Sequence, residues 1–244
     1  MQCVILAGGL GTRMRPLTET CPKTLLLVHG RPFAFYQMQW LASQGVTEVV
    51  YCIGHHGDMI RRYWETEASP VPSIRYVDEG AQLRGTGGAL RLARESGALQ
   101  ESFFVIYGDS FLPVRFAPIW DAFRTSEMPA LMTVLRNDGR WDRSNAVYRD
   151  GRVLLYDKKG NLAMHYIDYG LSALHRDILD GITAEVFDLA TLFHELSLRD
   201  RLAGFEVDQR FYEIGSPEGL QDFEQYLESQ VDEAPASALL LFAR

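Results

Sequence analysis

Apolar positions along the first half of the chain follow two alternating periods. Short apolar runs that end in glycine or polar residues predict four buried strands, at residues 2–6, 48–53, 74–77 and 101–110. Apolar residues at helical spacing predict helices between them, around residues 33–44, 59–64 and 86–97, with Thr86 as the N-cap of the third. Near-continuous apolar strands separated by helices are typical of a parallel sheet covered on both faces.

The second half of the chain has a different pattern, in which strands follow one another closely. Its predicted strands are residues 130–135, 145–157 and 164–174, and its predicted helices are residues 189–201 and 217–230. The Asp150-Gly151 pair predicts a hairpin turn inside the second of these strand segments. We therefore predict one α/β domain over residues 1–244, in which residues 136–244 add a smaller subdomain to residues 1–135.

Composition and charge limit the classes of function. With 244 residues, 47% of them hydrophobic, the chain can bury one sizeable core. Its net charge of -8 argues against nucleic acid and anionic membranes as partners, because such binding needs many cations. No apolar stretch reaches the ~20 residues of a membrane helix, and no secretory leader is recognisable. Three cysteines without metal-ligand spacing favour a reduced, cytoplasmic protein.

The candidate chemistry begins in the stretch LAGGLGTRMRPLTETCPK, directly after the first predicted strand. Glycines at the carboxyl end of a buried strand let backbone amides approach a phosphate. A dinucleotide fingerprint is excluded because Met14 stands where it needs glycine, and no Gly-Lys-Ser/Thr triplet of a P-loop occurs. Pro16 disfavours helix just before it, so we expect an extended loop that brings Arg13 and Lys23 over a polyphosphate.

The longer stretch GGLGTRMRPLTETCPKTLLLV resembles the signature of the sugar-1-phosphate nucleotidylyltransferases, GGxGTRLxPLTxxxPKPLLPV. This family includes glucose-1-phosphate thymidylyltransferases and the guanylyltransferases of mannose and heptose 1-phosphate. The chain departs from the pattern at Met14, Thr24 and Leu27, and none of these changes removes a charged group. The resemblance implies that a sugar 1-phosphate attacks the α-phosphorus of a nucleoside triphosphate, which releases pyrophosphate and forms an NDP-sugar.

The resemblance also implies a fold and a different binding role for each half of the chain. The fold is a Rossmann-like mixed sheet, mainly parallel and flanked by helices, of the nucleotide-diphospho-sugar transferase type. Residues 1–135 would bind the nucleotide, and residues 136–244 would form a small sugar-phosphate-binding subdomain with the C-terminal helices. The stretches YGDSFL and FYEIGSPEGL look most like guanylyltransferases that act on heptose or mannose 1-phosphate in the synthesis of surface-polysaccharide precursors.

On the nucleotide side, the resemblance implies three catalytic residues. Arg13 would hold the triphosphate and the developing pyrophosphate, Lys23 would neutralise charge near the α-phosphate, and Asp109 would bind Mg²⁺. Gln82 would recognise the base through its amide. The expected nucleotide-binding residues are Leu6, Ala7, Gly8, Gly9, Gly11, Thr12, Arg13, Gln82, Gly85 and Thr86.

On the acceptor side, the second Mg²⁺ ligand is expected in FYEIGSPEG, where Glu213 takes the place of the aspartate in the family's W-x-D-x-G-T. The segment LLYDKKG resembles the family's E-K-P segment, so Lys158 would bind the sugar phosphate and Asp157 a sugar hydroxyl. Asp168 and Gly170 stand where relatives have an N-x-G that contacts the sugar.

Two other functions stay open on the sequence. A non-catalytic NDP-sugar-binding regulatory module of the same fold is disfavoured because Arg13, Lys23 and Asp109 occur together. A dinucleotide-dependent oxidoreductase is disfavoured by Met14. The expected partners are thus a nucleoside triphosphate and a sugar 1-phosphate, with no nucleic acid and no membrane. The apolar tail at residues 238–242 could pack on its own domain or on a second copy, as in a homo-oligomer.

Overall fold

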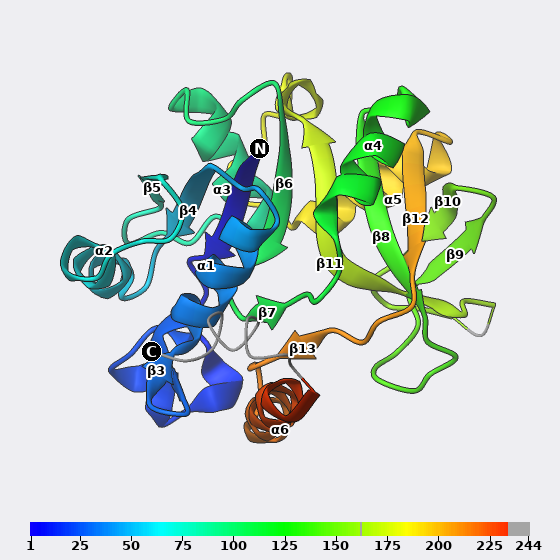
Figure 1. Cartoon of the computed structure of the whole chain (residues 1–244). Helices are drawn as coiled ribbons and strands as arrows, with labels where there is room; N and C mark the ends of the chain where they lie inside the picture. Colours follow the sequence, from blue (N-terminus) through cyan, green and yellow to red (C-terminus); the bar gives the residue numbers. More distant parts are fainter. Residues whose placement is uncertain (162, 234–244) are drawn as a thin grey trace.

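The computed structural model describes residues 1–161 and 163–233. Its centre is a nine-stranded sheet in the order β5-β4-β1-β6-β11-β8-β12-β10-β9 (Figure 1). Its strands are β1 (Gln2–Ala7), β4 (Glu48–Ile53), β5 (Ser73–Asp78), β6 (Ser102–Tyr107), β8 (Ala130–Arg136), β9 (Ala146–Arg149), β10 (Arg152–Tyr156), β11 (Tyr166–His175) and β12 (Leu202–Val207). Two short pairs lie outside this sheet, β2 (Leu27–Val28) with β3 (Arg31–Pro32) and β7 (Ser110–Phe111) with β13 (Tyr212–Glu213).

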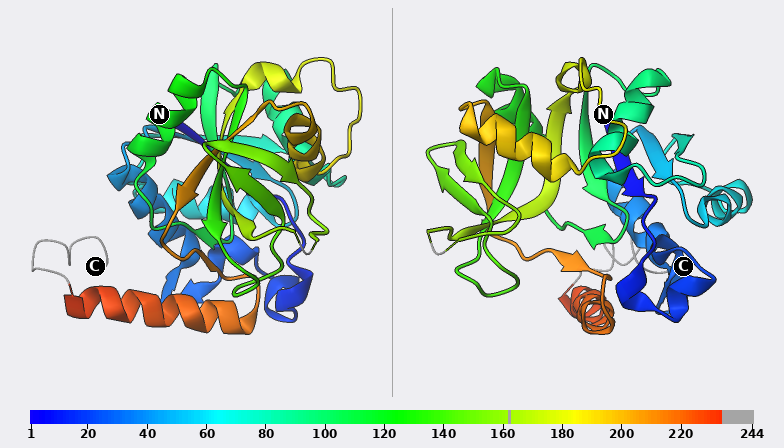
Figure 2. Two further views of the ribbon diagram at one scale, coloured as in Figure 1. Left: turned by 90° about the vertical axis from the view of Figure 1, so that its right-hand side faces the viewer. Right: turned by 180° about the vertical axis from the view of Figure 1, so that it is seen from behind.

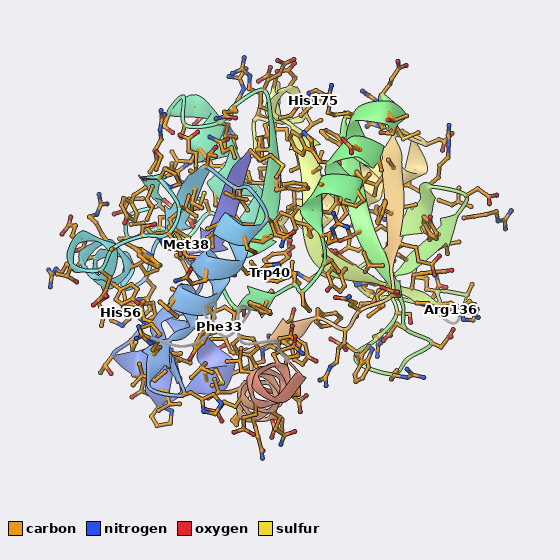
Figure 3. All side chains as sticks on the ribbon, viewed as in Figure 1. Phe33, Met38, Trp40, His56, Arg136 and His175 are labelled. Atoms are coloured by element: carbon orange, nitrogen blue, oxygen red, sulfur yellow. The ribbon has the colours of Figure 1, made fainter. Side chains whose placement is uncertain are left out.

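Helices cover both faces of the sheet (Figures 1 and 2). One face carries α1 (Phe33–Ser43), α2 (Gly57–Thr66) and α4 (Phe116–Ser126), and the other carries α3 (Gly85–Glu95) and α5 (Leu189–Leu198). Successive residues of β1 point to opposite faces, so that Ile5 belongs to the same apolar cluster as Met38 of α1, which Figure 3 labels, and Leu6 belongs to the cluster of α3. Among the described residues, no helix is long and apolar enough to cross a membrane.

The last helix, α6 (Pro217–Glu233), lies apart from the large sheet and next to β13 (Figure 1). Phe223 and Leu227 of α6 are buried in a third apolar cluster, together with Phe33 of α1 and Phe111 of β7. The rings of Phe33 and Phe223 meet edge to face, with centroids 5.2 Å apart. This cluster holds the C-terminal strand and helix against the segment that follows β6. The apolar tail at residues 238–242 lies outside the described residues.

The mixed α/β sheet predicted from the sequence is confirmed. Strands β5, β4, β1 and β6 are all parallel. In the second half, β11 runs antiparallel to β6 and β8, and β10 runs antiparallel to β9 and β12, while β8 and β12 are parallel. The hairpin turn is also confirmed, because Asp150 and Gly151 have the positive φ values, 48° and 78°, that a two-residue turn requires.

Two local expectations differ from the structure. Strand β12 is not among the predicted strands, because Gly204 interrupts its apolar run. In the sheet a Cβ at this position would lie 2.6 Å from the ring of Tyr148, so the side chain of a nearby strand uses the space. The prediction that Thr86 caps α3 is wrong, since the helix begins one residue earlier. The Thr86 hydroxyl instead donates a hydrogen bond of 2.8 Å to Asp188.

Candidate active site

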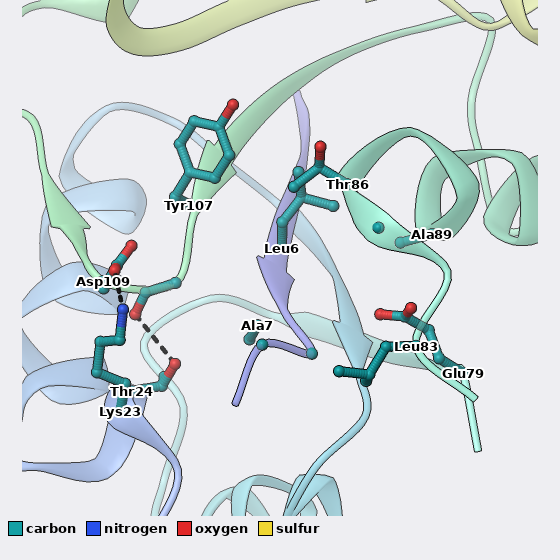
Figure 4. Close-up of a pocket in the computed structure, with 14 residues that line it drawn as sticks. Leu6, Ala7, Lys23, Thr24, Glu79, Leu83, Thr86, Ala89, Tyr107 and Asp109 are labelled. Atoms are coloured by element: carbon teal, nitrogen blue, oxygen red, sulfur yellow. Dashed lines mark hydrogen bonds and ion pairs between the residues drawn. The ribbon is translucent and has the colours of Figure 1, made fainter. Parts of the chain in front are cut away.

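A cavity of about 240 Å³ opens at the carboxyl ends of β1 and β6 (Figure 4). This edge of an open α/β sheet is where such folds bind ligands. The lining residues come from segments far apart in the sequence: Leu6, Ala7, Gly8, Gly9, Lys23, Thr24, Glu79, Leu83, Gly85, Thr86, Ala89, Tyr107, Gly108 and Asp109. Of the predicted nucleotide-binding residues, those that do not line it are Gly11, Thr12, Arg13 and Gln82.

The glycine-rich loop after β1 is not the extended loop that the sequence predicts. It forms three single 3₁₀ turns, η1 (Thr12–Met14), η2 (Leu17–Glu19) and η3 (Lys23–Leu25). Arg15, directly before Pro16, has the extended ψ of 142° that a following proline favours. Thr18 closes the loop by donating a hydrogen bond of 2.8 Å to the Gly11 carbonyl. The turns fold the loop back, so that Lys23 reaches the cavity.

Four charged side chains converge beside this cavity. The Lys23 ammonium lies 2.5 Å from Asp109 Oδ2 (Figure 4). Arg13 lies beside the same carboxylate, because a Cβ built on Gly215 would be 3.1 Å from Arg13 Nη2 and 3.7 Å from Asp109 Oδ2. Although Glu213 is an exposed residue, desolvation by the protein around its carboxylate, followed by the Asp109 carboxylate, raises the pKa of Glu213 to about 7, against the lowering effect of Arg13 and Lys23. The predicted catalytic and metal-binding residues are therefore brought together.

The donor set around Asp109 suits a hard divalent cation. Asp109 follows β6, and the pairing of β13 with β7 brings Glu213 opposite Ser110, next to it. The Asp109 carboxylate raises the pKa of Glu213, and a cation between the two carboxylates would offset this repulsion. Gly215 leaves open space beside Asp109 that a side chain would fill. Residues 1–161 and 163–233 contain no cluster of three or more possible ligands, so phosphate and water would complete the shell.

Glu79 is a cavity residue that the sequence reasoning missed. It follows β5, is only 8% exposed, and points its carboxylate into the cavity (Figure 4). Glu79 Oε2 accepts a hydrogen bond of 2.7 Å from the Arg84 backbone N–H. Burial raises the pKa of Glu79, although Arg84 opposes this. A Cβ on Gly8 would lie 2.2 Å from Glu79 Oε1, so only glycine permits this approach. Gln82, which the sequence predicts to recognise the base, is exposed and lies outside the cavity.

Asp188, also absent from the predicted site, joins the two halves of the chain. It caps the start of α5 by accepting a hydrogen bond of 3.1 Å from the Ala190 N–H. The same carboxylate accepts a hydrogen bond from the hydroxyl of Thr86, in the nucleotide half of the chain. It also forms an ion pair with Lys158, in the acceptor half. Burial alone would raise the pKa of Asp188, but these contacts hold that pKa below its usual value. Lys158 thus lies at the boundary between the halves.

The acceptor-side residues adjoin the cavity through Tyr107. Burial raises the pKa of Asp168 to about 6, with Asp188 adding to the rise, while the N–H of Gly170 donates to Asp168 at 2.9 Å and opposes it. Burial and the nearby carboxylates of Asp168, Asp188 and Asp109 raise the pKa of Tyr107, which lines the cavity. The tyrosine therefore lies between the predicted sugar residues and the predicted metal ligand.

Asp157 is the predicted acceptor residue whose side chain is already engaged in its own turn. Its Oδ1 accepts a hydrogen bond of 2.9 Å from the Lys159 N–H, while its backbone carbonyl accepts the N–H of Gly160 at 2.7 Å. The segment therefore forms a tight turn after β10 that presents Lys158 outward, toward Asp188.

A comparison with protein families decides the class of the chain. The family model described as nucleotidyl transferase matches residues 2–143, which include the glycine-rich loop and Asp109. The chain belongs to the nucleotidyl transferase family. The match ends within the second half of the chain, so it does not cover the acceptor-side residues of this nucleotidyl transferase, whose placement is known from the geometry described above.

Relatives of this nucleotidyl transferase include two kinds of guanylyltransferase. It is 28% identical over 234 residues to the D-glycero-alpha-D-manno-heptose 1-phosphate guanylyltransferase of Aneurinibacillus thermoaerophilus, covering 95% of this chain and 100% of that protein. It is 26% identical over 223 residues to the mannose-1-phosphate guanyltransferase of Yarrowia lipolytica, covering 89% of this chain and 61% of that protein. Both alignments extend through the acceptor half.

Solved structures show the same fold. HddC from Yersinia pseudotuberculosis, complexed with GMP-PN, superposes with a TM-score of 0.77 at 24% identity, covering 92% of this chain and 98% of that one. The UDP-glucose pyrophosphorylase from Acinetobacter baumannii superposes with a TM-score of 0.81 at 16% identity, covering 100% of this chain and 99% of that one. The nucleotide-diphospho-sugar transferase type of fold expected from the signature is therefore confirmed.

Proposed function

We propose that this nucleotidyl transferase moves a guanylyl group from GTP to a heptose or mannose 1-phosphate, giving a GDP-sugar and pyrophosphate. The observation that carries the proposal is the convergence of Arg13, Lys23, Asp109 and Glu213 beside the cavity at the carboxyl ends of β1 and β6. The names of the relatives support the guanylyl group and the two sugars.

The transfer itself needs positioned charge more than covalent chemistry. An oxygen of the sugar phosphate forms a bond to the α-phosphorus of GTP while the bond from that phosphorus to the β-phosphate oxygen breaks. Arg13 neutralises the charge that develops on the departing pyrophosphate and Lys23 the charge near the α-phosphate, and each such preorganised donor contributes about 3–4 kcal/mol. We propose that Asp109 and Glu213 would hold Mg²⁺, which would supply positive charge to the phosphates when bound.

The cavity chemistry favours guanine. The Glu79 carboxylate, fixed through Oε2 by the Arg84 N–H, has further lone pairs directed into the cavity. Guanine is the base whose pairing edge presents two adjacent donors, N1–H and N2–H, and a carboxylate accepts both. Adenine and cytosine present a ring-nitrogen acceptor there, and uracil presents one donor between two acceptors. We infer that Glu79 reads the base, a role that the sequence reasoning gave to Gln82.

The acceptor side suits a phosphorylated sugar. The Lys158 side chain is 67% exposed, and among the described residues its ion-pair partner is Asp188, which an incoming phosphate can replace. Asp168, ionised above about pH 6, offers oxygens to sugar hydroxyls. These groups adjoin the Tyr107 side of the cavity, so the sugar phosphate would approach the nucleotide from the second half of the chain.

The proposal is tested by pyrophosphate release over a matrix of the four nucleoside triphosphates with hexose and heptose 1-phosphates. We expect the largest kcat/KM for GTP with a heptose or mannose 1-phosphate, and a requirement for Mg²⁺. Calorimetry with the GDP-sugars separates the alternative of a regulatory module. If the chain binds a GDP-sugar but releases no pyrophosphate from any pair, the catalytic proposal is wrong.

A further inference from the structure

The turn that carries Asp109 is clamped by a buried glutamine from α1. Gln37 Nε2 donates one hydrogen bond of 2.9 Å to the Tyr107 carbonyl and another of 2.7 Å to the Ser110 carbonyl. These two carbonyls lie on either side of Gly108 and Asp109. Because both partners are acceptors, the amide nitrogen has to face the turn. Gln37 is 2% exposed, so water cannot replace these bonds.

The carbonyls of Gly108 and Asp109 accept hydrogen bonds from two other segments of the chain. Thr24 Oγ1 donates a hydrogen bond of 3.0 Å to the Gly108 carbonyl (Figure 4), and Thr24 is 2% exposed. The Ile214 N–H donates a hydrogen bond of 2.9 Å to the Asp109 carbonyl. Four successive carbonyls are therefore fixed from α1, from the glycine-rich loop and from the segment after β13. We call these bonds the turn clamp.

The turn clamp fixes the backbone of Asp109, whose carboxylate has one ion-pair partner and one neighbouring carboxylate. Asp109 Oδ2 contacts the Lys23 ammonium at 2.5 Å, while Glu213 pairs with Ser110, the residue after Asp109. A loose turn would let Asp109 move with Lys23 and away from Glu213. A fixed turn holds it where a cation between Asp109 and Glu213 can still be bound, because ligand geometry is set by the atoms behind the ligand.

We propose that Gln37 and Thr24 are positioning residues that hold Asp109 ready for the divalent cation. The inference rests on the proposed Mg²⁺ site. Gln37 does not line the cavity; Thr24 does, but its hydroxyl is bonded to the Gly108 carbonyl, so we propose that each acts through the backbone of the turn. Thr24 stands where the family signature has proline, which has no hydroxyl, so this part of the clamp belongs to this chain's own sequence.

Binding of Mn²⁺ alone to the full chain, followed by electron paramagnetic resonance, tests this without turnover. We expect Gln37→Leu, which removes both donors, and Thr24→Val, which removes one, to weaken Mn²⁺ binding at least tenfold. Thr24→Ser keeps the hydroxyl and should bind as the wild type does. Gln39→Leu is the matched control on α1, since Gln39 is half-buried and takes no part in the clamp. Hydrogen exchange of the Ser110 amide should be faster in the clamp variants.

The outcomes separate this inference from the proposed function. If Gln37→Leu and Thr24→Val are folded and bind Mn²⁺ like the wild type, the inference is overturned and the proposed function stands. If the wild-type chain itself fails to bind Mn²⁺, the metal site and the inference fall together. Should Gln37→Leu not fold, the Thr24→Val and Thr24→Ser pair decides, because valine keeps the shape of threonine without the hydroxyl donor, whereas serine keeps the donor without the methyl group.

Discussion

The base-reading role of Glu79 gives a sharp prediction for the substitution Glu79→Gln. The variant keeps the size of the side chain and one oxygen for the Arg84 N–H, which donates to Glu79 at 2.7 Å. It replaces the free oxygen by an NH₂ group, so a donor faces the two donors of guanine. The fold should be retained, because the contact with Arg84 survives and no volume changes.

The magnitude follows from the bonds that are lost. A hydrogen bond to a charged group contributes about 1.5–3 kcal/mol, and the 8% exposure of Glu79 leaves little water to compensate. Loss of one bond corresponds to a roughly 10- to 150-fold lower kcat/KM, and the loss for GTP should be at least this large. ITP lacks the 2-amino group, so the wild type should prefer GTP to ITP by one such bond. Glu79→Gln should reduce that preference.

The assay is pyrophosphate release with GTP, ITP, ATP and UTP at saturating sugar 1-phosphate, for the wild type, Glu79→Gln and Gln82→Ala. Gln82 is the matched control, since it lies three residues further on, is exposed and does not line the cavity. We expect it to leave the GTP preference unchanged. The reasoning is refuted if Gln82→Ala abolishes discrimination between GTP and ITP while Glu79→Gln retains it.

Three further predictions concern the charged groups. Lys23→Ala should lower kcat by about 10²–10³ with an unchanged circular dichroism spectrum, because a preorganised donor at the α-phosphate is lost; near-normal turnover would remove Lys23 from the mechanism. Lys158→Met should raise KM for the sugar 1-phosphate about tenfold but leave KM for GTP unchanged, whereas Lys159→Met, the neighbouring control, should change neither. The pKa of Asp168 is raised from 3.8 to about 6 in the folded chain, so its contribution to stability is present below pH 4 and lost as the pH rises through 6. The free energy of unfolding of Asp168→Asn, minus that of the wild type, should therefore be about 1–3 kcal/mol larger at pH 7 than at pH 4 when measured by urea titration. If this difference between variant and wild type is the same at both pH values, the assignment is contradicted.

Much of the nucleotide half of the site could be predicted from the sequence, because its residues lie at the ends of strongly patterned strands. Gly8 follows β1 and Asp109 follows β6, and the carboxyl ends of parallel strands share one edge of the sheet. Glu79 follows β5 in the same way. It was missed because a single carboxylate after a short, half-exposed strand carries no motif.

The acceptor half was less predictable, because its decisive contact has no local signal. Asp188 stands before α5 and looks like an ordinary helix cap. Its bond to Thr86 spans 102 positions of the chain, and its ion pair with Lys158 spans 30. Only the packing of α5 against α3 brings these groups together.

By itself, the sequence determined the kind of each element and the cationic glycine-rich loop, since periodicity and turn chemistry act over a few neighbouring residues. The tertiary structure alone decided which strand ends meet. It paired β13 with β7, and so brought Glu213 beside Asp109, through an apolar cluster built from both ends of the described chain. It also placed Lys23 against Asp109 across 86 positions. Burial of apolar surface rewards such contacts only when distant segments are already folded, so no local pattern encodes them.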